Sequence, residues 1–175
     1  MKRPLSLIAT VLAASLMLGT AACGTPFDIK TAPGFVALEN QRDFDWRATT
    51  PEGVVVAVRV VEDENRGDLA FWTQAMTLQL RDVTGYALLD SADLVSGDGT
   101  KGRLLKFGHD EDGKPYAYWV AIYPAQSRLF VVEAGGQKDL FERARPSIEW
   151  TMKSLRVRCR GLFAPVLSSY TCNRW

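Results

Sequence analysis

The segment HDEDGKP, residues 109–115, places several carboxylates close together and could therefore hold a cation. Asp110 and Asp112 suit Ca²⁺, but an EF-hand loop also needs a glycine at its sixth position and a glutamate at its twelfth. Counted from Asp110, those two positions hold Pro115 and Ala121, so the motif fails. Adjacent Asp, Gly and Lys residues are typical of exposed turns, and we interpret the segment as the tip of a β-hairpin.

A second candidate, GDGTKG at residues 97–102, has the spacing of a dinucleotide-binding motif. That motif needs a helix N-terminus behind the glycines, whose amides meet a pyrophosphate. The next residues, RLLKFG, are typical of a strand, so we predict a hairpin turn here as well.

The sequence contains no G-x-S-x-G, HExxH or P-loop motif. His109 is the only histidine, it falls in a predicted turn, and no serine is marked as a nucleophile for it to activate. We therefore predict a protein that is not an enzyme and that has no cofactor and no metal site. A hydrolase of unknown type is the less favoured alternative.

The chain begins with a pattern typical of a secretory signal peptide. Lys2 and Arg3 give a positive start, residues 5–18 are apolar or small, and Gly19 opens a short stretch of small residues. We assign residues 1–22 to this peptide. A retained membrane anchor stays open as an alternative. The uncharged run of residues 4–22 is close in length to the about 20 apolar residues that a membrane helix needs.

Ala21, Ala22 and Cys23 resemble the end of the lipobox of bacterial lipoproteins. That resemblance implies cleavage before Cys23, which becomes the N-terminus and carries diacylglycerol and a further acyl chain. Thr20 departs from the pattern, which usually has an aliphatic residue there, so an ordinary cut after Ala22 stays open. We favour lipidation of Cys23, which would anchor the protein in a membrane.

Lipidation of Cys23 leaves Cys159 and Cys172 as a pair. An exported protein meets an oxidising space in which disulfides persist, so we predict a disulfide between these two residues. Two free buried thiols are the alternative. The cysteines lack the CxxC spacing of zinc sites.

Removal of residues 1–22 from the 175 leaves enough chain for one domain with a hydrophobic core. The formal net charge of +1 becomes −1, because Lys2 and Arg3 leave with the peptide. A nearly neutral domain gives no electrostatic reason to expect nucleic acid as a partner.

Residues 44–63 predict two strands joined by a turn at Pro51–Gly53, and the run Val54–Val61 predicts a central strand covered on both faces. Residues 86–136 alternate strand-like segments with Gly-, Asp- and Ser-rich turns, which indicates an antiparallel meander.

Two amphipathic helices are expected to pack on this sheet. The first begins after Asp68 and ends at Gly85, with an apolar stripe of Leu69, Trp72, Met76, Leu80 and Val83. We interpret this stripe as part of the core, and a partner-binding helix is the alternative. The second covers residues 138–155, and Pro146 should bend or split it.

Aromatic side chains on the predicted helix and sheet could line a groove for a small ligand. The candidates are Trp72, Tyr118 and Trp119. Alternation along a strand sends Tyr118 and Trp119 to opposite faces, so a role in the core is the simpler interpretation.

The order of these elements resembles the PsbP/DcrB-like family, which includes many bacterial lipoproteins. The matching pieces lie within residues 44–155 and end with FERARPSIEWTMKSL. The resemblance implies an α+β fold, an antiparallel sheet of about six strands in an α/β/α sandwich. We place this domain at residues 35–155, after a lipidated tether at residues 23–34 and before a tail at residues 156–175.

Members of that family look like binding or adaptor modules. We therefore expect an envelope lipoprotein that binds a protein partner or supports an assembly. Gly24 follows Cys23, which resembles the outer-membrane default of lipoprotein sorting, facing the periplasm, if the cell is Gram-negative. The alternative is a carrier of a small ligand or lipid.

Overall fold

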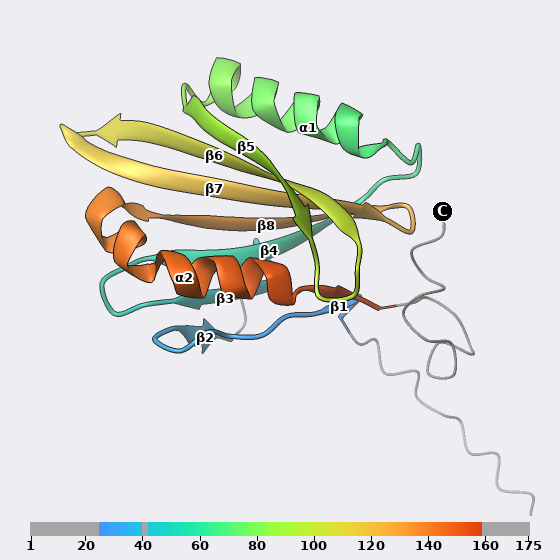
Figure 1. Ribbon diagram of the computed structural model, residues 1–175, viewed down its shortest axis with the longest axis horizontal. Helices are drawn as coiled ribbons and strands as arrows, with labels where there is room; N and C mark the ends of the chain where they lie inside the picture. The colour runs from blue at the N-terminus through green and yellow to red at the C-terminus, as the bar shows by residue number, and fades with distance from the viewer. Residues whose placement is uncertain (1–24, 40–41, 159–175) are drawn as a thin grey trace, which may run out of the picture.

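Four long strands follow one another as a meander, β5 (Ala87–Val95), β6 (Lys101–Glu111), β7 (Lys114–Ala125) and β8 (Arg128–Gln137). With β2 (Val36–Leu38), β3 (Trp46–Thr49) and β4 (Val55–Glu62) they form one antiparallel sheet in the order β2-β3-β4-β8-β7-β6-β5 (Figure 1). The computed structural model describes residues 25–39 and 42–158. The predicted antiparallel meander is confirmed, and the sheet has seven strands where about six were expected.

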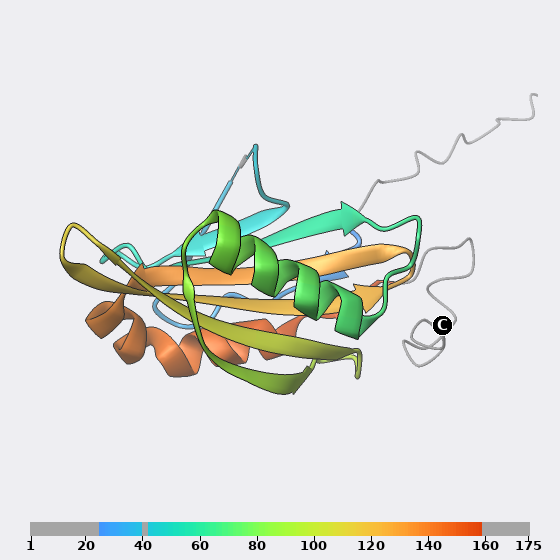
Figure 2. The same ribbon diagram turned by 90° about the horizontal axis from the view of Figure 1, so that it is seen from above.

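The two helices cover opposite faces of the sheet. Helix α1 (Leu69–Leu78), which continues into the π-helical turn η1 (Gln79–Val83), lies on one face, and helix α2 (Lys138–Ser154) lies on the other (Figures 1 and 2). We call these the α1 face and the α2 face. The predicted α/β/α sandwich is therefore confirmed.

Each face of the sheet has its own hydrophobic core, because strand residues alternate between the faces. On β7, Trp119 and Tyr123 belong to the core under α2, whereas Val120 and Ile122 belong to the core under α1. Phe141, Ile148 and Met152 of α2 complete the first core, and Leu80 completes the second.

Strand β4 differs from the prediction for residues 54–61. Val56 and Val58 are fully buried under α2, but Arg59 and Val61 are exposed on the α1 face. The reason is that α1 packs on β6 and β7, so it does not cover the part of the α1 face that β4 forms. The continuous β-branched run is therefore covered on one face only over its second half.

The ends of α1 follow the sequence prediction. The Asp68 carboxylate accepts a hydrogen bond from the backbone N–H of Phe71 at 2.7 Å, as an N-cap does. Gly85 ends the segment with a φ of +80°, a left-handed conformation that suits glycine. The prediction for Val83 was wrong, since this residue is 72% exposed. The π-turn changes the angular spacing of the side chains and moves Val83 off the apolar stripe.

Helix α2 is one continuous helix with Pro146 inside it, so the predicted split was wrong. Phe141, Ile148 and Met152 are buried on its inner side and hold both halves of the helix on the sheet. Packing on both sides of the proline offsets the lost backbone donor.

The two glycine-rich segments are hairpin turns, as predicted. Residues 96–100 join β5 to β6, and Asp112 and Gly113 join β6 to β7 with φ values of 51° and 72°. The turn from β7 to β8 also has positive φ at both central residues, 55° at Gln126 and 58° at Ser127. Two residues with a Cβ in this conformation carry backbone strain.

Folded structure begins before the expected domain boundary at residue 35. Strand β1 (Phe27–Asp28) pairs antiparallel with β9 (Arg156–Val157), so the two ends of the described chain lie side by side. Phe27 is buried and meets the Phe130 ring edge-on at 6.4 Å. The assignments of residues 1–22, and of Cys23, Cys159 and Cys172, lie outside the described residues and stay predictions. Within the described chain, no helix is long and apolar enough to span a membrane.

Candidate functional site: the surface around helix α1

Helix α1 has an unusual composition for a helix on a protein surface. From Leu69 to Leu80 the sequence LAFWTQAMTLQL contains no charged residue, and none of the ten residues of α1 is fully buried. A solvated helix usually carries charged side chains on its outer face. The outer face of α1 is therefore apolar or neutral and open to contact.

The inner row of α1 packs on the sheet as predicted, through Leu69, Trp72 and Met76. On the outer side Phe71 is 57% exposed and Leu78, two turns later, is 49% exposed. We call Phe71 and Leu78, with the uncharged residues between them, and Val83 the α1 surface; the exposed Arg81 and Asp82 border it next to Val83.

Polar groups on the helix are partly used within the helix itself. The hydroxyls of Thr73 and Thr77 donate to the carbonyl oxygens of Leu69 at 2.6 Å and of Thr73 at 2.8 Å, one turn back. These bonds occupy the hydroxyl hydrogens, so the polar groups that the segment presents to a partner are mainly the exposed amides of Gln74 and Gln79.

The start of α1 is held by a buried carboxylate. Asp63 Oδ2 accepts hydrogen bonds from the Gly67 backbone N–H and from Trp72 Nε1, both at 2.8 Å, and Asp63 is only 7% exposed. In the sequence, Asp63 is one of three consecutive acidic residues at positions 62–64, and nothing sets it apart from the other two. Asp63 and Trp72 are nine residues apart in the sequence, and no local pattern predicts their contact.

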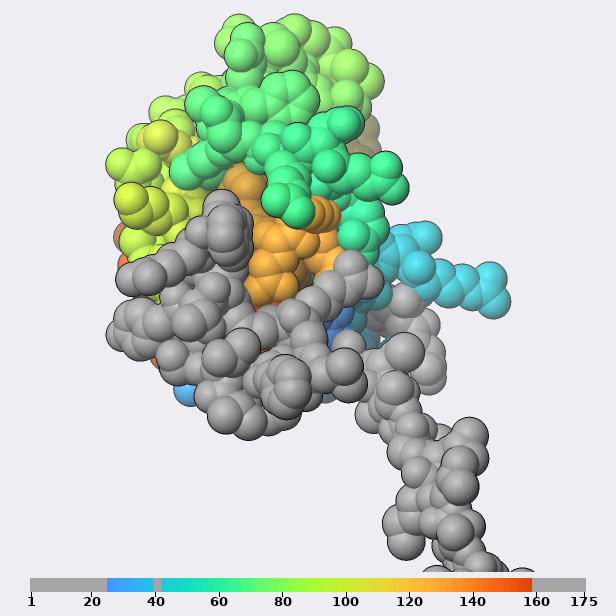
Figure 3. All heavy atoms as spheres, turned by 90° about the vertical axis from the view of Figure 1, so that its right-hand side faces the viewer, coloured from blue at the N-terminus to red at the C-terminus, as the bar shows by residue number. Residues whose placement is uncertain are grey.

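The same loop is tied to the turn between β7 and β8. The Asp63 backbone N–H donates to Ser127 O at 2.8 Å, and Arg66 Nε donates to Ser127 Oγ at 3.0 Å. Figure 3 looks at this end of the molecule, where the green segment leading into α1 lies above the orange β7–β8 turn. The strained turn thus serves as the support for the start of α1.

Beside α1, the open half of the sheet carries a charged pair. Arg59 on β4 donates to Glu133 on β8, with Nη2 at 2.6 Å from each carboxylate oxygen and Nε at 3.2 Å from one of them. The hydrogen bond to Glu133 raises the pKa of Arg59. Burial raises the pKa of Tyr118, and the negative charge of Glu133 adds to that shift. Tyr118 is therefore a neutral hydrogen-bonding group at physiological pH.

His109 lies in strand β6, within the sheet, where the sequence had suggested a turn. Its ring stacks between Tyr86, at 4.2 Å between centroids, and Tyr116, at 5.3 Å. The alternation of Leu105, Phe107 and His109 could have placed it on the α1 face. His109 Nδ1 is buried and has no hydrogen-bond partner within the described part of the chain.

On the same strand, Glu111 Oε2 lies 4.0 Å from Nε2 of this histidine. Tyr86 also meets Tyr118 edge-on at 5.4 Å, so the histidine and the three tyrosines form one aromatic cluster. This cluster fixes the chain directly after η1 on the sheet.

The three predicted groove residues do not come together. Trp72 and Tyr118 both lie on the α1 face, where they pack against the core under α1. Trp119 lies on the α2 face and meets Phe141 edge-on at 5.0 Å. The sheet separates Trp119 from the other two, so a groove lined by all three cannot form. Ligand binding by any one of them stays a prediction.

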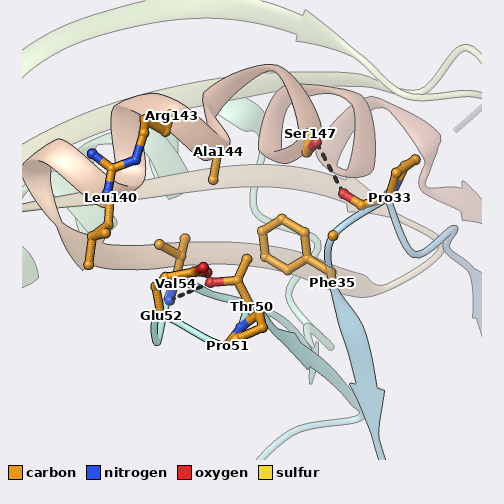
Figure 4. A pocket seen from close by; sticks show the side chains of 11 residues that line it. Pro33, Phe35, Thr50, Pro51, Glu52, Val54, Leu140, Arg143, Ala144 and Ser147 are labelled. Atoms are coloured by element: carbon orange, nitrogen blue, oxygen red, sulfur yellow. Dashed lines mark hydrogen bonds between the residues drawn. The ribbon is translucent and has the colours of Figure 1, made fainter.

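A separate cleft of about 450 Å³ opens on the α2 side, between α2, the β3–β4 turn and the segment before β2 (Figure 4). Its apolar residues include Phe35, Val54 and Ala144. Arg143 lies at the cleft and makes no ion pair with another described residue. No sequence pattern predicts this cleft, because its walls come from three segments that are far apart along the chain.

No family model matches this chain, and no curated protein matches it in sequence. Several solved structures share its fold. Cyanobacterial PsbP (CyanoP) from Synechocystis sp. PCC 6803 is 10% identical, with a TM-score of 0.54 over 75% of this chain and 86% of CyanoP. LpqN from Mycobacterium tuberculosis is 15% identical, with a TM-score of 0.56 over 74% of this chain and 81% of LpqN.

The Ran-binding protein Mog1p of Saccharomyces cerevisiae is also similar in fold. It is 13% identical, with a TM-score of 0.53 over 78% of this chain and 92% of Mog1p. At these identities the likeness concerns the fold alone. The PsbP-like α+β fold that the sequence resemblance implied is therefore confirmed.

Proposed function

We propose that this chain is a lipid-anchored protein of the bacterial envelope whose domain binds a protein partner through the α1 surface. The observation that carries the proposal is the exposed helix without charge, in which Phe71 and Leu78 are about half exposed on one side. The centres of protein–protein interfaces lose charged residues and gain large apolar ones, which is the composition of this surface.

The proposal also explains why α1 is held so firmly at its start. Asp63 fixes the first turn through two side-chain hydrogen bonds, and Asp68 caps it. A surface that is rigid before binding loses little conformational entropy when the partner arrives, so more of the contact energy appears as affinity.

The similar structures support a binding role by precedent. Mog1p is a Ran-binding protein, and LpqN is involved in cell envelope biogenesis. Both descriptions belong to those proteins. Together with the lipobox-like Cys23, they favour an envelope binding module for this chain over an enzyme.

The proposed anchor would hold the domain near the membrane. Cys23 is four residues before Phe27, the first residue of β1, and an extended chain spans at most about 3.6 Å per residue. A lipid on Cys23 would leave a reach of roughly 14 Å. The partner should therefore be a membrane protein or another protein of the envelope surface.

The test is site-specific photo-crosslinking in living cells, with the photoreactive residue at Phe71 or Leu78. Trp150 on α2 is exposed on the opposite side and serves as the control position. We expect one envelope protein to be crosslinked from positions 71 and 78, and a Leu78→Glu change to abolish the adduct from position 71. Equal adducts from Trp150, or an adduct that survives Leu78→Glu, would contradict the proposal.

A small-ligand carrier is the second candidate, now at the cleft under α2 and not at the predicted aromatic groove. The cleft of about 450 Å³ falls within the usual range for ligand sites and combines apolar residues with the charged side chains of Arg143 and Glu52. We expect native mass spectrometry of the purified protein to show a bound small molecule with an apolar part, and Ala144→Phe to remove it. A protein free of ligand in both forms would exclude the carrier.

A further inference from the structure

The sheet has two edges of very different length. At one edge, β2 has three residues, whereas at the other edge β5 has nine and pairs only with β6 among the described strands. An uncovered edge strand offers its outward N–H and C=O groups to another chain. We propose that the second half of β5 binds an extended, basic segment of a partner protein as an additional antiparallel strand.

The direction of the backbone groups follows from the pairing with β6. The Ser96 N–H donates to Thr100 O at 3.0 Å, so residue 96 faces β6. Hydrogen bonding alternates along an antiparallel strand, and Leu94 and Ala92 therefore also face β6. Asp93 and Val95 point their N–H and C=O groups away from the sheet, toward the open edge.

The first half of β5 is closed to such pairing. A bulge between Leu88 and Asp90 interrupts the register, and Asp90 Oδ1 accepts a hydrogen bond from the Ser91 N–H at 2.9 Å. Bulges and capped amides are devices that prevent strand addition. Neither device is present between Asp93 and Val95, where the register with β6 is regular.

The side chains at this open stretch specify the partner. The Asp93 carboxylate is 84% exposed, and its Oδ1 lies 3.1 Å from Nη1 of Arg103 on β6. Val95 is 54% exposed. Opposite charges on directly facing residues stabilise a strand pair, so the partner strand should place Lys or Arg opposite Asp93 and an apolar residue near Val95.

The same charge argues against pairing between two copies of this chain. An antiparallel pair centred on Asp93 would set the two Asp93 carboxylates directly opposite each other, and like charges in that position are destabilising. We therefore assign the edge to a different, basic chain. The proposal does not depend on the α1 surface, because α1 packs on β6 and β7.

The test uses the full chain and a short labelled peptide of alternating Val and Thr with one central Lys. We expect saturable binding, slower amide exchange at Asp93 and Val95, and roughly tenfold weaker binding when the Lys is replaced by Glu or when alternate peptide nitrogens are methylated. Asp93→Lys should reverse the preference, so that the Glu peptide binds better than the Lys peptide. Leu78→Glu is the matched control and should leave peptide binding unchanged.

Three results would overturn the proposal. One is equal binding of the N-methylated peptide, which would show contact through side chains only. Another is an unchanged peptide preference in Asp93→Lys. The third is a concentration-dependent dimer in sedimentation experiments that Val95→Pro disrupts, which would assign the edge to a second copy. Failure of the crosslinks from α1 would leave all of these measurements unaffected.

Discussion

Asp63 connects three parts of the molecule that lie apart in sequence. Its side chain accepts from Gly67 and Trp72, and its backbone N–H donates to Ser127. A buried carboxylate with two donors aimed at it differs from the exposed acids around it, because removal of the acceptor would leave those donors without a partner.

Replacement of Asp63 by Ala should therefore destabilise the fold. We expect a loss of about 2–4 kcal/mol in the free energy of unfolding, since two part-buried donors lose their acceptor. Chemical denaturation followed by tryptophan fluorescence measures this change. Glu64→Ala, at an exposed neighbouring acid, is the control, and an equal effect of both changes would show that Asp63 has no special role.

In the β7–β8 turn, a substitution at Ser127 should stabilise the protein. Ser127 has a φ of 58°, which costs a residue with a Cβ about 1 kcal/mol relative to glycine. Ser127→Gly should raise the midpoint of thermal unfolding, because relief of this strain outweighs one exposed hydrogen bond from Arg66.

Ser127→Ala separates the two contributions at this position. It removes the same hydroxyl but keeps the Cβ and the strain, so it should lower the thermal midpoint slightly. A stabilising Ala variant, or a destabilising Gly variant, would mean that the turn is not strained at Ser127.

At the scale of whole elements, local signals predicted where α1 begins and ends but not how it packs. Asp68 and Gly85 act through neighbouring backbone groups, so the sequence shows them directly. Val83 is the last residue of the π-turn, which no residue type marks. The apolar composition of α1 was interpreted as a core stripe, and only the structure reveals that its outer side is apolar as well.

The same division holds for the strands. Alternation placed Tyr118 and Trp119 on opposite faces, because each strand residue has a side that is fixed by its neighbours. The half-open β4 and the pairing of β1 with β9 depend on where distant segments pack. Those contacts could not be derived from periodicity.

Strands β1 and β9 provide a prediction about pH. Arg158 donates to Asp28, and this hydrogen bond lowers the pKa of Asp28 below its ordinary value of 3.8. A carboxylate with a lowered pKa stabilises the folded state above its unfolded pKa, and the contribution is lost as pH falls through the lowered value. Stability should thus be unaffected from neutral pH down to about pH 5 and should fall below pH 4.

Amide exchange at Arg158, whose N–H donates to Pro26 O at 2.9 Å, measures this pairing directly. Its protection should decrease in acid in the wild type and be insensitive to pH below 5 in Asp28→Asn. An identical pH dependence in both proteins would exclude Asp28 as the titrating group.

At the scale of the whole molecule, the proposed lipid anchor on Cys23 would determine where the domain works. Cells labelled with a fatty-acid analogue should incorporate it into the wild type but not into Cys23→Ser. Cys159→Ser is the matched control and should label normally, because it removes a different cysteine. Equal labelling of wild type and Cys23→Ser would refute lipidation.

The short ladder between β1 and β9 gives the molecule a mechanical weak point. Only two residue pairs join these strands. Eight or more residue pairs join β4 to β8, β8 to β7, β7 to β6 and β6 to β5. Tension applied at residue 25 would peel β1 away one hydrogen bond at a time and draw Phe27 out of the core. The large sheet would stay intact, so such a pull would lengthen the tether before it unfolded the domain.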